Sequence, residues 1–331
     1  MSQHLSARTT LSFYRYVLLP EPQAMVDTLR AAWAPLGVLG RIYVAAEGIN
    51  AQLSLPSTNI DAFLLQLHPI FPDMEVKTAL EEPNEAFLKL TIKVRDKLVG
   101  DGLSDDSFDT TRVGRHLDAA SFHQAMDQGT AVVVDMRNQY ESEVGHFRGA
   151  LLPKANTFRD ALPEVLEQLR GREEDKILLY CTGGIRCEKA SAWLIHNGFK
   201  DVNQLHGGII AYARQVALDH VPSRFAGKNF VFDHRRGERV TAEVIARCHQ
   251  CEQPYDGHTN CHFEGCNRLF IQCASCADEF SGCCSRLCQE VQLKPRDEQI
   301  AIQHEWEERQ GKNKHWRLTR LPPSVDRMAK A

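Results

Sequence analysis

The stretch 180-YCTGGIRCEKA-190 places a cysteine, Cys181, between an apolar run and a glycine-rich turn. The backbone amides of such a turn, together with the positive end of a following helix, stabilise an anion. A cysteine in that setting should have a depressed pKa and be a thiolate at neutral pH. We therefore expect Cys181 to be catalytic, with a buried packing thiol as the alternative. The residues that we expect to stabilise its charge are Thr182, Gly183, Gly184 and Arg186.

The loop between Cys181 and Arg186 is short, with only Thr182 to Ile185 between them. Loops of this type that hold a phosphate are wider, so the tight spacing favours a single sulfur atom carried on Cys181 as a persulfide. Cys187 is a secondary candidate with two interpretations. It could resolve a persulfide or sulfenate on Cys181, or it could begin the next helix and pack beneath the loop.

Nine further cysteines crowd into residues 248–288. In a reducing compartment such a cluster binds metal more often than it forms disulfides. Two Cys-x2-Cys pairs have nearly the spacing of a zinc ribbon, and we expect at least one structural zinc there. Its ligands would be Cys248, Cys251, Cys273 and Cys276. A second site could use Cys261, Cys266 and residues 283–288, with the pairing left open; the alternative is a small core of reduced thiols.

The stretch 309-RQGKNKHWRLTR-320 is basic and contains no acidic residue. Basic side chains contact phosphates, and an interleaved aromatic ring can stack on an unpaired base. The candidate RNA-binding residues are Arg309, Lys312, Lys314, Trp316, Arg317 and Arg320, with a smaller basic group at 235–239. The alternative is a solvated charged tail without a partner.

Length and composition limit the class of protein. The chain has 331 residues, of which 43% are hydrophobic and 25% are charged, so it can build two or three ordinary domains. A net charge of -4 argues against coating of nucleic acid by the whole surface. No apolar run approaches the roughly 18 residues of a membrane span, and the N-terminal residues lack the apolar segment of a secretory signal. We expect a cytoplasmic protein without a membrane partner.

The first segment, residues 1–100, alternates strand and helix signals. The first six elements have the order β-α-β-β-α-β of a ferredoxin-like domain, and one more strand follows them. Such a domain serves either as a binding platform or as a scaffold. We expect strands at 12–19, 38–45, 50–55, 74–79 and 87–94, and helices at 21–33 and 60–67. Residues 101–117 have no apolar periodicity and should form a linker.

The second segment, residues 118–215, has α/β character. The short apolar runs 131–135 and 177–180 are typical of buried parallel strands. Helices are expected at 121–128, 160–170 and 187–198. We therefore expect a parallel-sheet core, followed by a cysteine-rich third segment, residues 216–331, that ends in the basic tail.

The second segment resembles a rhodanese domain. The stretch 134-VDMRNQYESEVGHFRGA-150 is similar to the family's signature, and 205-LHGGIIAY-212 is similar to its closing turn. The order Tyr140-Glu141 is transposed relative to the family. Asp135 and His146 are expected to be structural, because they lie beside the first strand and outside the cysteine loop. The matching positions are Asp135, Arg137, Glu141, Gly145, His146, Gly149 and Ala150.

Over residues 10–290 the chain resembles a narrower family, the oxygen-dependent tRNA uridine hydroxylases. The resemblance rests on an acylphosphatase-like first domain with the turn 47-EGIN-50, on the loop at 180–190, and on the stretches 258-HTNC-261 and 282-GCCS-285. It implies conversion of the wobble uridine of tRNA to 5-hydroxyuridine, with molecular oxygen as co-substrate and the loop cysteine essential. It also implies the tRNA anticodon loop as the partner.

Two other functions remain open at this point. A sulfurtransferase would pass persulfide sulfur between Cys181 and a partner protein. A non-catalytic module would bind RNA or protein and keep a vestigial rhodanese fold, although the intact cysteine and arginine count against it. The sequence contains no recognisable flavin, haem or nucleotide motif.

Overall fold

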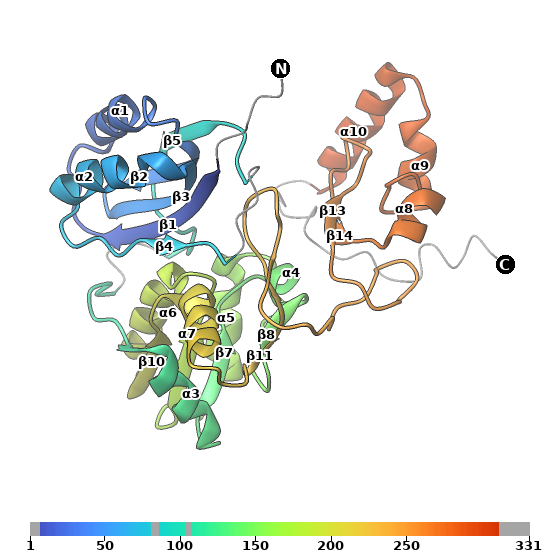
Figure 1. Ribbon diagram of the computed structural model, residues 1–331. Helices are drawn as coiled ribbons and strands as arrows, with labels where there is room; N and C mark the ends of the chain where they lie inside the picture. The colour runs from blue at the N-terminus through green and yellow to red at the C-terminus, as the bar shows by residue number, and fades with distance from the viewer. Residues whose placement is uncertain (1–6, 81–85, 104–107, 311–331) are drawn as a thin grey trace.

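The computed structural model describes residues 7–80, 86–103 and 108–310. Figure 1 shows three parts: an N-terminal α+β domain that lies against a central α/β domain, and a C-terminal region that extends to one side of both. No helix of the described ranges is long and apolar enough to cross a membrane.

The N-terminal domain is a five-stranded sheet in the order β4-β1-β3-β2-β5, covered on one face by two helices. Neighbouring strands are antiparallel except β2 and β5, so the expected ferredoxin-like order is confirmed. The elements are β1 (Arg8–Tyr16), α1 (Pro22–Trp33), β2 (Leu39–Ala45), β3 (Gly48–Pro56), the 3-10 turn η1 (Ser57–Asn59), α2 (Ile60–Ile70), β4 (Lys77–Thr78) and β5 (Leu90–Val94).

Residue alternation along β1 and β3 separates the two faces of this sheet. The apolar set, which includes Phe13 and Leu53, is buried against α1 and α2. The intervening polar residues point to the opposite face. Strand β3 begins at Gly48, earlier than expected, because Gly48 has φ of 139° and approaches β1 closely. A Cβ there would lie 2.0 Å from the carbonyl oxygen of Arg15.

The central domain is a parallel four-stranded sheet in the order β6-β10-β9-β7. Helices α5 and α6 pack on one face, and α3 and α7 pack on the other. Both faces are therefore buried, which explains the continuous apolar runs in β7 and β9. The elements are β6 (Arg115–Leu117), α3 (Ala119–Asp127), β7 (Val132–Asp135), α4 (Gln139–Ser142), β8 (Gly145–Phe147), α5 (Phe158–Gln168), β9 (Lys176–Tyr180), α6 (Ile185–His196), β10 (Asp201–Leu205) and α7 (Gly208–Leu218).

The segment 101–117, which we expected to be a linker, contributes to the folded domains at both ends. Residues 115–117 form the edge strand β6, which pairs with β10. Two of these three residues are exposed, so the strand has no apolar alternation to detect. At the other end Asp101 is buried, because its carboxylate pairs with Lys97 and Lys189 at 2.8 and 2.7 Å.

The C-terminal region is attached to the central domain by β11, which pairs with β8. It also contacts the N-terminal domain, where Glu238 accepts a hydrogen bond from the backbone N–H of Leu80 at 3.1 Å. Its elements are β11 (Phe225–Asn229), β12 (Glu238–Arg239), β13 (His258–Asn260), β14 (Leu269–Ile271), α8 (Ala274–Glu279), α9 (Arg286–Gln292) and α10 (Arg296–Gln310).

Candidate active site

Cys181 lies where β9 ends and the chain turns into α6. Gly184 makes this short turn possible, because its φ of 106° lies in the left-handed region that favours glycine. Helix α6 begins at Ile185, earlier than the Cys187 that we expected, so Arg186 lies in its first turn. The backbone N–H of Gly184 donates to the sulfur of Cys181 at 3.1 Å. The start of α6 therefore provides donors for a thiolate.

The thiol of Cys181 is fully buried, and burial by itself raises its pKa. Favourable interactions outweigh this effect. The thiol of Cys187 donates a hydrogen bond to the sulfur, the charge of Arg186 attracts it, and the amides of Arg186 and Gly184 donate to it. Together they lower the pKa of Cys181 to about 5. The group is thus a thiolate at neutral pH.

Cys187 is the direct side-chain neighbour of this thiolate. It is also fully buried, in the apolar core between α5, α6 and the sheet. Burial and the hydrogen bond to Cys181 raise the pKa of Cys187 well above its usual value. Cys187 therefore stays protonated and donates its S–H, while its side chain packs beneath the loop.

The guanidinium of Arg186 faces a carboxylate rather than the sulfur. Its two terminal nitrogens donate to the two oxygens of Glu141 at 2.6 and 2.8 Å. A weaker contact at 3.4 Å joins it to the hydroxyl of Thr182. This two-point geometry fixes the orientation of the guanidinium. Arg186 therefore acts on Cys181 through its charge and its backbone N–H.

A second buried ion pair lies at the end of β7. Arg137 and Asp135 are fully buried and pair at 2.6 Å, and Tyr180 donates its hydroxyl proton to the same carboxylate at 2.7 Å. Arg137 also donates to the carbonyl of Gly145. His146 bonds the carbonyl of Ser142, at 2.8 Å. The contacts of Asp135 and Arg137 join β7, β8 and β9, and that of His146 joins β8 to α4, in line with the structural role expected for Asp135 and His146.

The N-terminal end of α7 makes backbone hydrogen bonds to the cysteine loop. The N–H groups of Ile209 and Ile210 donate to the carbonyls of Cys181 and Thr182 at 3.0 and 3.3 Å. Gly208 permits this approach, since a Cβ there would lie 2.6 Å from both carbonyl oxygens. The stretch 205–212 thus fixes the backbone of the loop.

The polar face of the N-terminal sheet covers the loop from above. Lys77 donates to the carbonyl of Gly183 at 3.1 Å, and its ammonium lies over the ring of Tyr14. Tyr14 in turn donates to Glu188 of α6 at 3.0 Å. Sequence reasoning missed these residues, although a signal was present: the polar residues of β1 and β3 recur at every second position.

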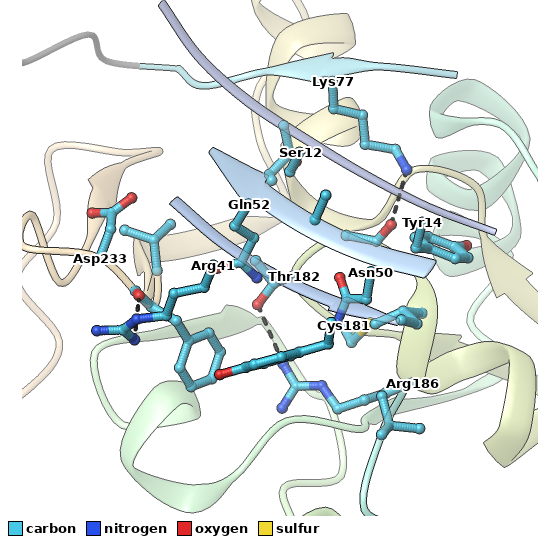
Figure 2. Close-up of a pocket in the computed structure, with 18 of the residues that line it drawn as sticks. Ser12, Tyr14, Arg41, Asn50, Gln52, Lys77, Cys181, Thr182, Arg186 and Asp233 are labelled. Atoms are coloured by element: carbon cyan, nitrogen blue, oxygen red, sulfur yellow. Dashed lines mark hydrogen bonds between the residues drawn. The ribbon is translucent and has the colours of Figure 1, made fainter. Parts of the chain in front are cut away.

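A cavity of about 460 Å³ lies between this polar face and the loop. Figure 2 shows Cys181, Thr182 and Arg186 on one side and side chains of the N-terminal sheet on the other. The cavity is within the range typical of small-ligand sites. The N-terminal sheet supplies Ser12, Tyr14, Arg41, Tyr43, Asn50, Gln52 and Lys77 to its lining, and the C-terminal region supplies Phe232, Asp233 and Arg235.

The expected zinc ligands come together in the C-terminal region. The four sulfur atoms of Cys248, Cys251, Cys273 and Cys276 lie within 4.8 Å of one another. A second cluster has the same property and resolves the pairing that the sequence left open; its members are Cys261, Cys266, Cys284 and Cys288. Cys283 is outside both, and its thiol donates to Gln292 at 2.7 Å.

The structure describes only part of the two basic stretches that are candidates for RNA binding. Residues 311–331, with the candidates Lys312, Lys314, Trp316, Arg317 and Arg320, lie outside the described residues. Arg309 is exposed at the end of α10 and pairs with Glu305. In the group 235–239, Arg235 pairs with Asp233 and Glu238, and Arg239 pairs with Asp256. These pairs reduce the basic character of the smaller group.

Three family models match consecutive parts of the chain. Residues 8–98 match an acylphosphatase-like domain described as UPF0176, residues 118–215 match the rhodanese-like domain, and residues 226–289 match a rhodanese C-terminal domain. The cysteine loop, the polar sheet face and both cysteine clusters lie within these three matches.

Close relatives cover nearly the whole chain. A protein of Leptospira interrogans named tRNA uridine(34) hydroxylase is 52% identical over 97% of this chain and 88% of its own length. A protein of Cronobacter sakazakii with the same name is 51% identical over 88% of this chain and 84% of its own length. An Escherichia coli protein of that name is 50% identical over 85% of this chain and 81% of its own length.

Proposed function

This chain belongs to the tRNA uridine(34) hydroxylase family, and from that membership we propose that it hydroxylates the uridine at position 34 of tRNA with Cys181 as the reactive group. It is an oxidoreductase that carries a rhodanese-like domain. The product is 5-hydroxyuridine, and molecular oxygen is the co-substrate. The anticodon loop is single-stranded, so its bases reach a pocket without duplex opening.

One observation carries the proposal for Cys181. Cys181 lines the 460 Å³ cavity, and its buried sulfur accepts hydrogen bonds from the start of α6 and from Cys187, which lower its pKa to about 5. A sulfur that is a thiolate at neutral pH is an electron-rich group next to a cavity for a small ligand. A packing thiol would gain nothing from these donors. Cys181 works either as the thiolate itself or as a persulfide after a sulfur donor protein has loaded it.

Each four-cysteine cluster holds one structural zinc. Four thiolates about 2.3 Å from a tetrahedral zinc lie about 3.8 Å apart. The sulfurs of Cys251 and Cys273 are 3.6 Å apart, and Cys284 lies 3.7 Å from Cys266 and 3.6 Å from Cys288. Backbone N–H groups also donate to a sulfur of each cluster, as in the surroundings of zinc thiolates. The first cluster uses the four ligands expected from the sequence.

Analysis of tRNA nucleosides by mass spectrometry tests the function. Cells that lack the gene should lose 5-hydroxyuridine-derived nucleosides, and the wild-type gene should restore them while Cys181→Ser should not. Loss of a thiolated nucleoside instead would support the sulfurtransferase alternative, which the tight sulfur-binding loop favours as the second candidate. Unchanged nucleosides would contradict both enzymatic functions.

A further inference from the structure

The motif 47-EGIN-50 has a structural explanation at three of its four positions. Glu47 pairs with Lys189 of α6 at 2.7 Å and so joins the two domains. Gly48 provides the close approach to β1, and Ile49 is fully buried in the core. Asn50 lines the cavity, and its carboxamide has no hydrogen-bond partner in the described ranges. The same is true of Gln52, two residues further along the strand.

Strand register places these two carboxamides side by side. Asn50 pairs with Tyr14 of β1 and Tyr43 of β2, so it lies between two aromatic residues on the polar face. Gln52 lies in the next row of that face, between Ser12 and Arg41. Figure 2 shows Asn50 and Gln52 projecting from the sheet into the space above Cys181 and Thr182.

The charged groups of the cavity are already engaged. Arg41 donates to the carbonyl of Phe232 at 3.1 Å, and Lys77 donates to the carbonyl of Gly183. Arg235 pairs with two carboxylates, and Arg186 pairs with Glu141. Among the described residues of the lining, the side chains without a hydrogen-bond partner include the carboxamides of Asn50 and Gln52 and the hydroxyls of Ser12 and Tyr43, and these neutral groups suit a neutral polar ligand such as a base.

We propose that Asn50 and Gln52 recognise the imide edge of the target uracil and thereby turn its C5–C6 edge toward Cys181. The inference rests on the proposed function. A carboxamide offers an acceptor and two donors, which match the N3–H of uracil and its flanking carbonyls. Because C6 lies across the ring from N3, a base held by its imide edge at the sheet presents C5 and C6 to the opposite wall. That wall is the Cys181 loop.

Cytosine provides the contrast for a test, because it has an acceptor at N3 and an amino group at C4. We would measure dissociation constants of the purified full-length protein for an anticodon stem-loop RNA with U34 and for the same RNA with C34. A two-point contact to a base discriminates by about tenfold or more, so wild type should prefer U34 by that factor. Asn50→Ala and Gln52→Ala should each bring the ratio of the two dissociation constants, C34 over U34, toward one. Asn50→Asp, which keeps the size but loses the donors, should do the same.

Gln23→Ala is the matched control, since Gln23 is an exposed carboxamide on α1, on the other side of the sheet. The Gln23→Ala variant should keep the wild-type ratio of dissociation constants for the two RNAs. The salt dependence of binding should not change in any variant, because phosphate contacts remain, and thermal unfolding would identify a misfolded variant. Equal wild-type affinity for the two RNAs would overturn the inference, and so would wild-type ratios in both Asn50→Asp and Gln52→Ala. Neither result would affect the role of Cys181, which the nucleoside analysis of Cys181→Ser tests separately.

Discussion

Arg186 and Glu141 form a two-point ion pair beneath the candidate active site, with nitrogen–oxygen distances of 2.6 and 2.8 Å. The Glu141 side chain is fully buried and that of Arg186 is 10% exposed. The pair holds a positive charge near Cys181 without placing the guanidinium on its sulfur. Direct contacts to the sulfur come instead from Cys187 and from the start of α6. The contributions of the Arg186 charge and of the Cys187 thiol can each be removed by a side-chain substitution.

Cys181→Ser should abolish hydroxylation and leave the fold intact. Serine is nearly isosteric with cysteine, but its hydroxyl stays protonated at neutral pH, so the electron-rich sulfur is lost. The measurement is the 5-hydroxyuridine content of tRNA from a deletion strain that carries the variant, with thermal unfolding of the purified variant as the control. A wild-type content would show that the loop is only a scaffold.

Arg186→Ala should reduce activity by about a hundredfold, since one electrostatic partner of the reactive group is lost. It should also destabilise the protein by about 3–5 kcal/mol, because the carboxylate of Glu141 stays buried without its partner. Arg186→Lys separates the two effects, because it keeps the charge and loses the two-point geometry. Rates and denaturant unfolding of both variants are compared with wild type. Equal rates for Arg186→Ala and wild type would contradict a role for this charge.

Cys187→Ala should raise the pKa of Cys181 above its value of about 5, because the S–H donor to the thiolate is removed. A depressed pKa means that the thiolate is lost as pH falls through that value. The loss should therefore occur at a higher pH in Cys187→Ala than in wild type. The pH at which the thiolate is lost is measured from its ultraviolet absorbance, taken as the difference from the corresponding protein with Cys181→Ser. Cys187→Ser keeps a donor and should lie closer to wild type; identical titrations of all three proteins would contradict the hydrogen bond.

Elemental analysis of protein purified without chelator should find about two zinc per chain, one for each cysteine cluster. Cys248→Ser and Cys266→Ser should each remove about one equivalent and lower the unfolding temperature, because zinc binding contributes to folding. Cys283→Ser is the matched control, since Cys283 is buried in the same region but belongs to neither cluster. A zinc content below about a tenth of an equivalent in wild type would contradict both sites.

Deletion of residues 311–331 should weaken tRNA binding and flatten its salt dependence, because the removed stretch includes Lys312, Lys314 and Arg317. Replacement of Trp316 alone by alanine should weaken binding without changing the salt slope, since stacking releases no counterions. Filter binding over a range of salt concentrations measures both. An unchanged slope after deletion would mean that the tail is only a solvated surface.

Local patterns in the sequence were sufficient to predict the chemistry of the loop and to select the four cysteines of the first cluster. Cys181, the glycines and the start of α6 are neighbours along the chain, so their spacing alone predicts a thiolate held by backbone amides. The same holds for each Cys-x2-Cys pair, in which two ligands are brought together by one turn of backbone. The apolar runs of β7 and β9 likewise predict a sheet buried on both faces, since no exposed strand would be continuously apolar.

Only the tertiary structure decided which residues of the N-terminal domain face the Cys181 loop. Lys77 and Gly183 are in contact although 106 positions separate them, and Tyr14 contacts Glu188 across 174 positions. Such contacts depend on how one domain packs on another, and the polar alternation in β1 and β3 does not identify the surface that it meets. The ion pair of Arg186 with Glu141 and the membership of the second cysteine cluster are also long-range. In each case several partners satisfy the same local chemistry, and the packing of the whole chain selects one.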